Sequence, residues 1–247
     1  MLVLLPPSET KRDGGDGSRL DVGALAYPTL NPRRRALVRA VRSLARNPEA
    51  SQVALRLGPK QHAEIDRNRA LTVSPTMPAI DRYTGVLYDA LDASSLAEES
   101  REFAGAHVAI HSALFGLIGA LDPIPAYRLS HNSKVPDLPL KKHWSESVTS
   151  VLRTVTGPVL DFRSEAYVAM GPVPAGVDSV FLRVVTQDAD GQKRALNHFN
   201  KASKGAFTRA LSRNAQDLGS VDELLEWAAE SGFALQRGAS GELELSV

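Results

Sequence analysis

LVLLPPSETK, residues 2–11, decides the fold: four apolar residues run into a proline pair, and four polar side chains follow. A short apolar run that ends at proline is typical of a buried strand. The segments VAIH (108–111), PVLDF (158–162) and SVFLRVV (179–185) have the same character. These four segments predict a central sheet. Because only four apolar residues precede Pro6 and no basic residue comes before them, we expect neither a signal peptide nor a membrane anchor.

Helical periodicity surrounds these strands. In RRRALVRAVRSLAR (33–46) the apolar residues recur at helical spacing and the arginines take the other side, with Asn31 as the expected N-cap. Further helices are expected over residues 87–91, 95–104, 144–154, 204–218 and 220–232, the last with a capping box at Ser220. Residues 233–247 are expected to form a hairpin, as are residues 179–200, with a turn at 188–191 and a second strand at 195–200.

These elements predict an α+β (mixed α/β) fold: a single compact domain over residues 1–247, with a mixed central sheet and flanking helices. With 43% hydrophobic residues, the chain of 247 residues can bury a sizeable core. It has no cysteine, so disulfide frameworks, thiolate nucleophiles and cysteine metal sites are excluded, and a cytoplasmic location is expected. Phosphate-loop, dinucleotide-binding and zinc-hydrolase motifs are missing from the sequence, and we expect no cofactor and no metal.

Positive charge is concentrated in two segments. Residues 33–46 carry six arginines and no acid, and residues 192–216 carry six lysines or arginines and no acid. The two segments either converge on one polyanion-binding face or form separate solvated helix surfaces. The sequence leaves both arrangements open.

Polar side chains follow three of the expected strands, at the position where open sheets place their ligands. The three clusters are Ser8, Glu9, Thr10 and Lys11 after the first strand; Arg163, Ser164, Glu165 and Tyr167 after residue 162; and Asn200, Lys201, Ser203 and Lys204 after residue 199. We expect these clusters to line one cleft. Lys201 and Lys204, three residues apart at an expected helix start, would repel each other unless an anion lay between them, which suggests phosphate binding.

Asp161 lies inside an otherwise apolar strand. A buried carboxylate must be paired or hydrogen-bonded, because an isolated buried charge is very costly. Asp161 is therefore either a structural anchor, which caps loop amides or pairs with an arginine, or a functional group. The sequence favours neither interpretation.

Five segments, in order along nearly the whole chain, resemble the YaaA peroxide stress protein family. They are PPSETK (6–11), RYTGVLYDAL (82–91), HSALFGLIGALDPIPAYRLS (111–130), DFRSEAY (161–167) and NKASKG (200–205). The resemblance implies a cytosolic bacterial protein linked to hydrogen-peroxide defence, which binds DNA through a positively charged cleft and a helix-hairpin-helix-like element. Residues 114–121 are the candidate for that element; the alternative is that Gly116 and Gly119 pack against a neighbouring element.

The strand ends and the resemblance together give the candidate site residues. Those expected to bind DNA or phosphate are Ser8, Lys11, Arg82, Tyr83, Thr84, Arg128, Arg163, Ser164, Asn200, Lys201 and Lys204. The candidate catalytic carboxylates are Glu9, Asp161 and Glu165.

Three functional hypotheses follow. The first is a protein that binds duplex DNA by phosphate contacts and limits oxidative damage. The second is an enzyme acting on a nucleobase, nucleoside or nucleotide, because a passive phosphate binder has no use for carboxylates in a basic cleft. The third is a structural partner protein without a ligand. No partner is expected in a membrane.

Overall fold

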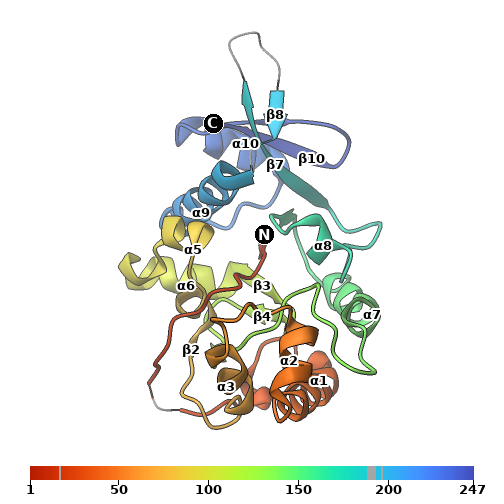
Figure 1. The fold of residues 1–247 in the computed structure, drawn as a ribbon. Coiled ribbons are helices and arrows are strands. Elements are labelled where there is room, and N and C mark those ends of the chain that lie inside the picture. The colour runs from red at the N-terminus through yellow and green to blue at the C-terminus, as the bar shows by residue number, and fades with distance from the viewer. Residues whose placement is uncertain (17, 188–192, 196) are drawn as a thin grey trace.

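Strand β1 (Leu2–Leu5) lies inside the main sheet in the computed structural model of the chain, which describes residues 1–16, 18–187, 193–195 and 197–247. The strand order is β4-β3-β1-β6-β7-β10-β9, with β8 paired to β7. Strands β3, β1, β6, β7 and β10 run parallel, whereas β4, β8 and β9 pair antiparallel with their neighbours. The mixed sheet and flanking helices of an α/β single domain are as predicted from the apolar segments (Figure 1).

The strands and helices have the following bounds. The strands after β1 are β2 (Met77–Pro78), β3 (Val108–Ser112), β4 (Gly116–Gly119), β5 (Pro123–Ile124), β6 (Val159–Asp161), β7 (Ser179–Gln187), β8 (Lys193–Ala195), β9 (Ala234–Arg237) and β10 (Glu242–Ser246). The α-helices are α1 (Asn31–Leu44), α2 (Pro48–Leu55), α3 (Ala63–Arg69), α4 (Ala79–Arg82), α5 (Val86–Leu91), α6 (Glu98–His107), α7 (Leu140–Leu152), α8 (Glu165–Val168), α9 (Asn197–Asn214) and α10 (Val221–Glu230). Short 3₁₀ helices lie at η1 (Val22–Ala24), η2 (Pro28–Leu30) and η3 (Ala93–Ser95).

Helices cover both faces of the sheet (Figure 1). Helices α5, α6 and α9 lie together on one side, where α9 packs against α5 and β7, and α7 lies on the other side against β4. The side chains of β1 are buried throughout, because neighbours flank the strand on both edges and helices cover it on both faces. This burial explains why its sequence is continuously apolar and does not alternate.

The segment expected to form a helix-hairpin-helix-like element is instead a β-hairpin. Residues 116–119 form β4, which pairs with β3 in the register Ser112↔Gly116. Ser112 Oγ accepts hydrogen bonds from the backbone N–H groups of Leu114 and Phe115 and so fixes the turn. Gly116 has a φ of +67°, and a Cβ there would lie 2.8 Å from the Trp144 ring. The glycine therefore serves packing, the alternative that the sequence had left open.

The strand expected over residues 195–200 is also wrong. Strand β8 ends at Ala195, residue 196 lies outside the described residues, and α9 begins at Asn197. Packing of α9 decides this segment, since Gly205 brings α9 into close contact with α5, and Phe207 is fully buried against the rings of Phe162, Trp227 and Phe233. A short alternation of apolar and polar residues favours a strand only weakly, and such tertiary contacts outweigh it. The predicted turn at 188–191 also lies outside the described residues.

Other predicted boundaries shift by a few residues. Asn31 lies inside α1, where its side chain accepts a hydrogen bond from Arg34. Helix α6 begins at Glu98, because the hydroxyls of Ser94 and Ser95 bond to Asp92 and do not cap it. The capping box at Ser220 is confirmed: its hydroxyl accepts from the N–H of Glu223 at the start of α10.

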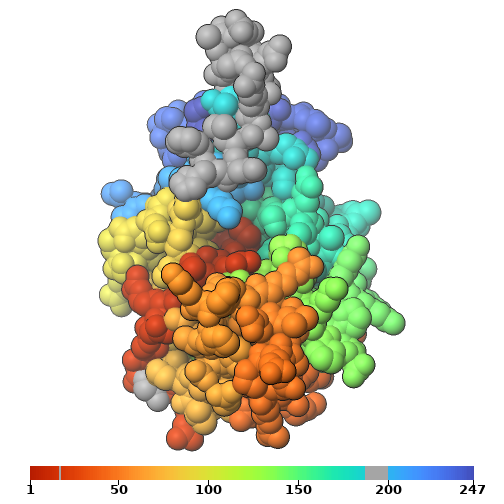
Figure 2. Space-filling view, in the orientation of Figure 1, coloured from red at the N-terminus to blue at the C-terminus, as the bar shows by residue number. Residues whose placement is uncertain are grey.

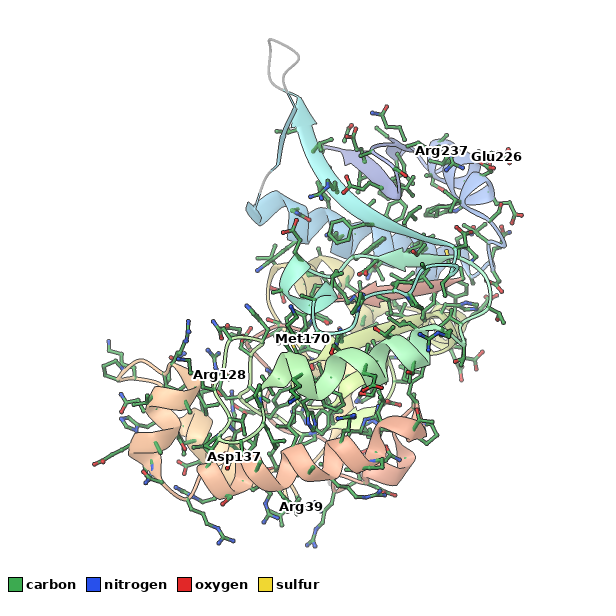
Figure 3. The ribbon with its side chains drawn as sticks, turned by 90° about the vertical axis from the view of Figure 1, so that its right-hand side faces the viewer. Arg39, Arg128, Asp137, Met170, Glu226 and Arg237 are labelled. Carbon is green, nitrogen blue, oxygen red and sulfur yellow. The ribbon has the colours of Figure 1, made fainter. Side chains whose placement is uncertain are left out.

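The two basic segments do not converge. Helix α1 lies at one end of the molecule and α9 near the other, in both views of the ribbon (Figures 1 and 3). The positive charge therefore forms separate surfaces. Among the described residues, no helix is long and apolar enough to cross a membrane.

Candidate functional site

The ends of β1, β3 and β6 lie at one edge of the sheet, because these strands are parallel neighbours. The chain runs from β1 to β3 on one side and then crosses to β6 on the other, so the strand order reverses between β1 and β6. Open α/β sheets bind ligands in the crevice outside such a reversal. Figure 2 shows this face hollowed, with atoms at the red, N-terminal end of the colour scale on the floor of the hollow.

Lys11 is a buried amine at this edge. Its Nζ donates to the carbonyl oxygens of Ser8 at 3.0 Å and Glu9 at 3.1 Å. The same nitrogen lies 4.1 Å from the centre of the Tyr127 ring and 5.4 Å from that of Tyr83, at cation–π distance. Burial, with a smaller contribution from the charge of Arg128, lowers the pKa of Lys11 to about 7. Lys11 therefore changes its charge near neutral pH.

A chain of hydroxyls supports the aromatic rings around Lys11. The hydroxyl oxygens of Ser112 and Tyr127 lie 2.7 Å apart, and those of Tyr127 and Tyr83 lie 2.6 Å apart. Burial raises the pKa of both tyrosines, so they remain neutral phenols. Strand β3, the loop after β5 and the end of α4 thus hold one rigid polar wall.

Arg128 is a second buried cation at the edge. One of its Nη atoms donates to Glu9 Oε2 at 2.8 Å, and the Arg128 side chain is 9% exposed whereas that of Glu9 is 56% exposed. Within the described residues, the buried Nε of Arg128 has no hydrogen-bond partner. We call Lys11, Tyr83, Tyr127 and Arg128, together with Glu9, the edge site.

Asp161 and Arg163 form a buried ion pair beside the edge site. The guanidinium donates to both oxygens of Asp161, at 2.8 and 2.6 Å, and the N–H of Arg163 also donates to Asp161. Asp161 therefore both caps a loop amide and pairs with an arginine, the two roles named for a structural anchor. Because every nitrogen of the Arg163 guanidinium also bonds within the protein, Arg163 is not free for the phosphate contact predicted for it.

His111 completes this cluster. An arginine N–H always donates, so Arg163 Nη1 bonds to an unprotonated His111 Nδ1 at 2.9 Å. The proton of the neutral ring then lies on Nε2, which is buried and has no partner in the described structure. Burial, and then the charge of Arg163, holds the pKa of His111 well below its ordinary value. His111 is a neutral hydrogen-bond donor.

The remaining candidates divide by exposure. Lys204 is buried, donates to the carbonyl of Phe162 at 3.1 Å and has its pKa lowered to about 8 by burial. Of the predicted cluster at residues 200–204, Lys204 therefore contacts the residue that follows β6. The cluster lies on helix α9 and does not follow a strand. One turn earlier on α9, Asn200 is half-buried and Lys201 is exposed.

Arg82 is fully buried, and its guanidinium donates to four backbone carbonyls, of Arg12, Gly14, Pro75 and Ile124. This geometry gives Arg82 a structural role in holding the loop after β1, in place of the predicted phosphate contact. The hydroxyls of Ser8, Thr10 and Thr84 form a small cluster, with Thr84 Oγ1 3.0 Å and Ser8 Oγ 3.2 Å from Thr10 Oγ1. The exposed residues Ser164 and Glu165 begin α8, and Glu165 pairs with Arg183.

A separate basic surface lies on α1. We call Arg35, Arg39 and Arg42 on its outer side, together with Arg46 in the turn that follows, the arginine stripe. Figure 3 shows Arg39 pointing away from the molecule. A groove of about 490 Å³ is lined by Arg39, Arg42, Ser43, Arg46 and Arg69. No acidic side chain lines it, and the buried Nε of Arg42 has no partner in the described parts of the chain.

The sequence interpretation missed Tyr127 and His111 as site residues. His111 could have been found by the argument that singled out Asp161, since it is also a polar residue inside an apolar strand. The arginine stripe is visible in the sequence as a charged segment, but the sequence does not assign it to the site. Its role depends on which cations stay exposed, and only the fold shows this.

Known proteins are similar to this chain over most or all of its length. The profile of a family described as "Peroxide stress protein YaaA" matches residues 1–238. A UPF0246 protein of Corynebacterium glutamicum strain R is 40% identical over 252 aligned residues, which cover 100% of this chain and 99% of the relative. A UPF0246 protein of Streptomyces coelicolor is 35% identical, over 97% of this chain and 93% of the relative. An uncharacterized protein of Campylobacter jejuni is 24% identical, over 87% and 85%. The family match includes the edge site and the arginine stripe.

Proposed function

The chain belongs to the YaaA peroxide stress protein family, and from its charge distribution we propose that it binds duplex DNA through the arginine stripe and so limits oxidative damage during peroxide stress. The observation that carries this proposal is the groove lined by Arg39, Arg42, Arg46 and Arg69. Phosphate contacts supply essentially all of sequence-independent DNA affinity, and arginine is well suited to them because its planar fork matches phosphate oxygens.

The arginine stripe has the length and exposure that a DNA backbone needs. Arg35, Arg39 and Arg42 lie on α1 over about 10 Å of helix, and Arg46 follows in the turn after Leu44, so the stripe can contact several phosphates of one strand. Arg35, Arg39 and Arg46 are exposed. Within the described ranges, none of these three has an ion pair. Their charge is therefore available to a polyanion.

The buried cations in the edge site and beside it suit a duplex less well. Lys11, Arg128, Arg163 and Lys204 are buried, and their hydrogen bonds to the protein hold them in place. A duplex backbone needs protruding cations, since its phosphates line a convex surface. The DNA contact is accordingly proposed on α1, in place of the cleft expected from the sequence.

We expect the binding of a fluorescent duplex, followed by anisotropy, to be steeply salt-dependent and nearly blind to sequence. With about four phosphates neutralised, the logarithm of the association constant should fall with log[salt] at a slope of about −3.6. Replacing Arg39, Arg42 and Arg46 together by glutamine should reduce this slope to about −1 and weaken binding at least tenfold at 0.1 M salt.

Lys201→Gln is the matched control, because it removes an exposed cation from α9, at the other end of the molecule. It should leave affinity and slope unchanged. Equal losses in the control and the triple variant would contradict an interface on α1, and a large preference for one duplex sequence would contradict binding by backbone contacts alone.

The alternative proposal is an enzyme that acts on a nucleobase, nucleoside or nucleotide. Its predicted catalytic carboxylates are already engaged, since Asp161 pairs with Arg163, Glu9 with Arg128 and Glu165 with Arg183. The observation that supports chemistry at this edge is Lys11, whose pKa of about 7 suits proton transfer at neutral pH. In such an enzyme the proton-transfer group would be Lys11.

A further inference from the structure

Arg128 has more hydrogen-bonding capacity than the protein uses. One Nη of Arg128 donates to Glu9, whose side chain is exposed. The Nε of Arg128 is buried and has no acceptor among the described residues. An Nη and the Nε of a guanidinium together can bind two oxygens of one group. A buried N–H without an acceptor costs about 1–3 kcal/mol. Such a donor is typical of a position where a ligand oxygen binds.

Lys11 adds a second buried cation close to Arg128. It donates two hydrogen bonds to backbone carbonyls, of Ser8 and Glu9, and its third position lies over the face of Tyr127. The charges that act on Lys11 come from its own loop, from α3 and from the loop after β5: Glu9, Glu64, Arg67 and Arg128. The neighbouring Tyr83 and Tyr127 are neutral. Lys11 is thus held between two arginines and two carboxylates.

We propose that Arg128 and Lys11 form a binding site for a small molecule that carries a carboxylate or phosphate group, and that this group displaces the carboxylate of Glu9. The site is distinct from the DNA surface on α1 and extends the proposed function. A ligand with two oxygens on one centre reaches both Nη and Nε of Arg128, whereas Glu9 bonds at one Nη.

Displacement of Glu9 is energetically feasible. Its side chain is 56% exposed, and ion pairs with one partner in solvent contribute about 0–1 kcal/mol. Arg128 itself is buried, so its guanidinium does not protrude as contact with a duplex backbone requires. The carboxylate of Glu9 therefore competes with the ligand for Arg128.

Binding should be linked to protonation of Lys11. A second negative charge near Lys11 favours its ammonium form and raises its pKa. Below pH 7 Lys11 is already charged, so binding takes up no proton there. Above pH 7 the ligand must bind with proton uptake, and its affinity should fall as the pH rises from 7 to 9.

The experiment is an NMR titration of the Arg128 Nε–H signal, assigned by its loss in Arg128→Lys, with inorganic phosphate and with acetate in separate arms. We expect a saturating shift with at least one anion, and half-saturation at a three- to tenfold lower concentration in Glu9→Gln. An equal chloride titration controls for screening. A shift with phosphate alone identifies phosphate as the ligand group, and a shift with acetate identifies carboxylate.

No shift with either anion would overturn the site, as would a shift that chloride reproduces. Unchanged half-saturation in Glu9→Gln would overturn the displacement of Glu9. The pH arm repeats the titration between pH 6 and 9 in the wild type and in Lys11→Met, because comparing the two proteins at each pH cancels the change in charge of phosphate itself. The ratio of the wild-type half-saturation concentration to that of Lys11→Met should rise above pH 7, and a constant ratio would overturn the role of Lys11. Duplex binding by the triple variant on α1 is measured separately, so failure of one proposal does not imply failure of the other.

Discussion

Replacing Asp161 by asparagine is expected to lower the free energy of unfolding by about 3–5 kcal/mol, because it leaves the buried guanidinium of Arg163 without its counter-charge. The two side chains share two hydrogen bonds, and the loop amide of Arg163 also donates to Asp161. An asparagine amide would place an N–H donor against the guanidinium donors. The measurement is urea denaturation followed by circular dichroism.

Glu165→Gln is the control for this prediction. Its carboxylate also pairs with an arginine, but the side chain is 81% exposed and the distance to Arg183 is 3.7 Å. Its loss should change the free energy of unfolding by no more than about 0.5 kcal/mol. If Asp161→Asn were as stable as Glu165→Gln, Asp161 would not be the structural anchor that the ion pair indicates.

Gly205→Ala is expected to lower the free energy of unfolding by about 1–3 kcal/mol, although alanine favours a helix over glycine by about 1 kcal/mol. A Cβ at this position would lie 2.1 Å from the backbone carbonyl oxygen of Leu87 and 3.0 Å from the Cβ of Ala90. Helices α5 and α9 would have to move apart, because a backbone atom cannot rotate away. Thermal denaturation measures the loss.

Gly105→Ala is the matched control, since Gly105 also lies inside a helix. A Cβ there would meet the end of the Leu121 side chain at 2.7 Å, and Leu121 is partly exposed and free to change rotamer. This variant should be neutral or slightly more stable than the wild type. A stable Gly205→Ala protein would show that the contact between α5 and α9 is looser than the structure indicates.

The central strands were predictable because a strand that is buried on both faces consists almost entirely of apolar residues. The apolar runs of β1, β6 and β7 lie where the sequence predicted them, and so does the capping box of α10. Strand β4 and the start of α9 were not predictable, because long-range partners decide them. Trp144, 28 residues away, packs on Gly116, and Leu87 lies against Gly205. The spacing of apolar residues within a segment does not indicate which distant residues the segment will contact.

The candidate site was predictable in position but not in chemistry. Polar clusters after apolar strands located Glu9 and Lys11 at the edge of the sheet, and the family resemblance added Arg128. Residue type could not show that Arg82 is held by four carbonyls whereas Arg39 points into solvent, because both are arginines in basic or mixed segments. Burial separates structural cations from available ones.

Survival of peroxide-treated bacteria tests the central claim, that the arginine stripe carries the function. Cells that lack the protein would be supplied with the wild type, with the triple variant Arg39→Gln, Arg42→Gln and Arg46→Gln, or with Lys201→Gln, at equal protein levels. We predict that the wild type and Lys201→Gln restore survival and that the triple variant does not, since the arginine stripe loses three of its four cations. Full protection by the triple variant would contradict the account.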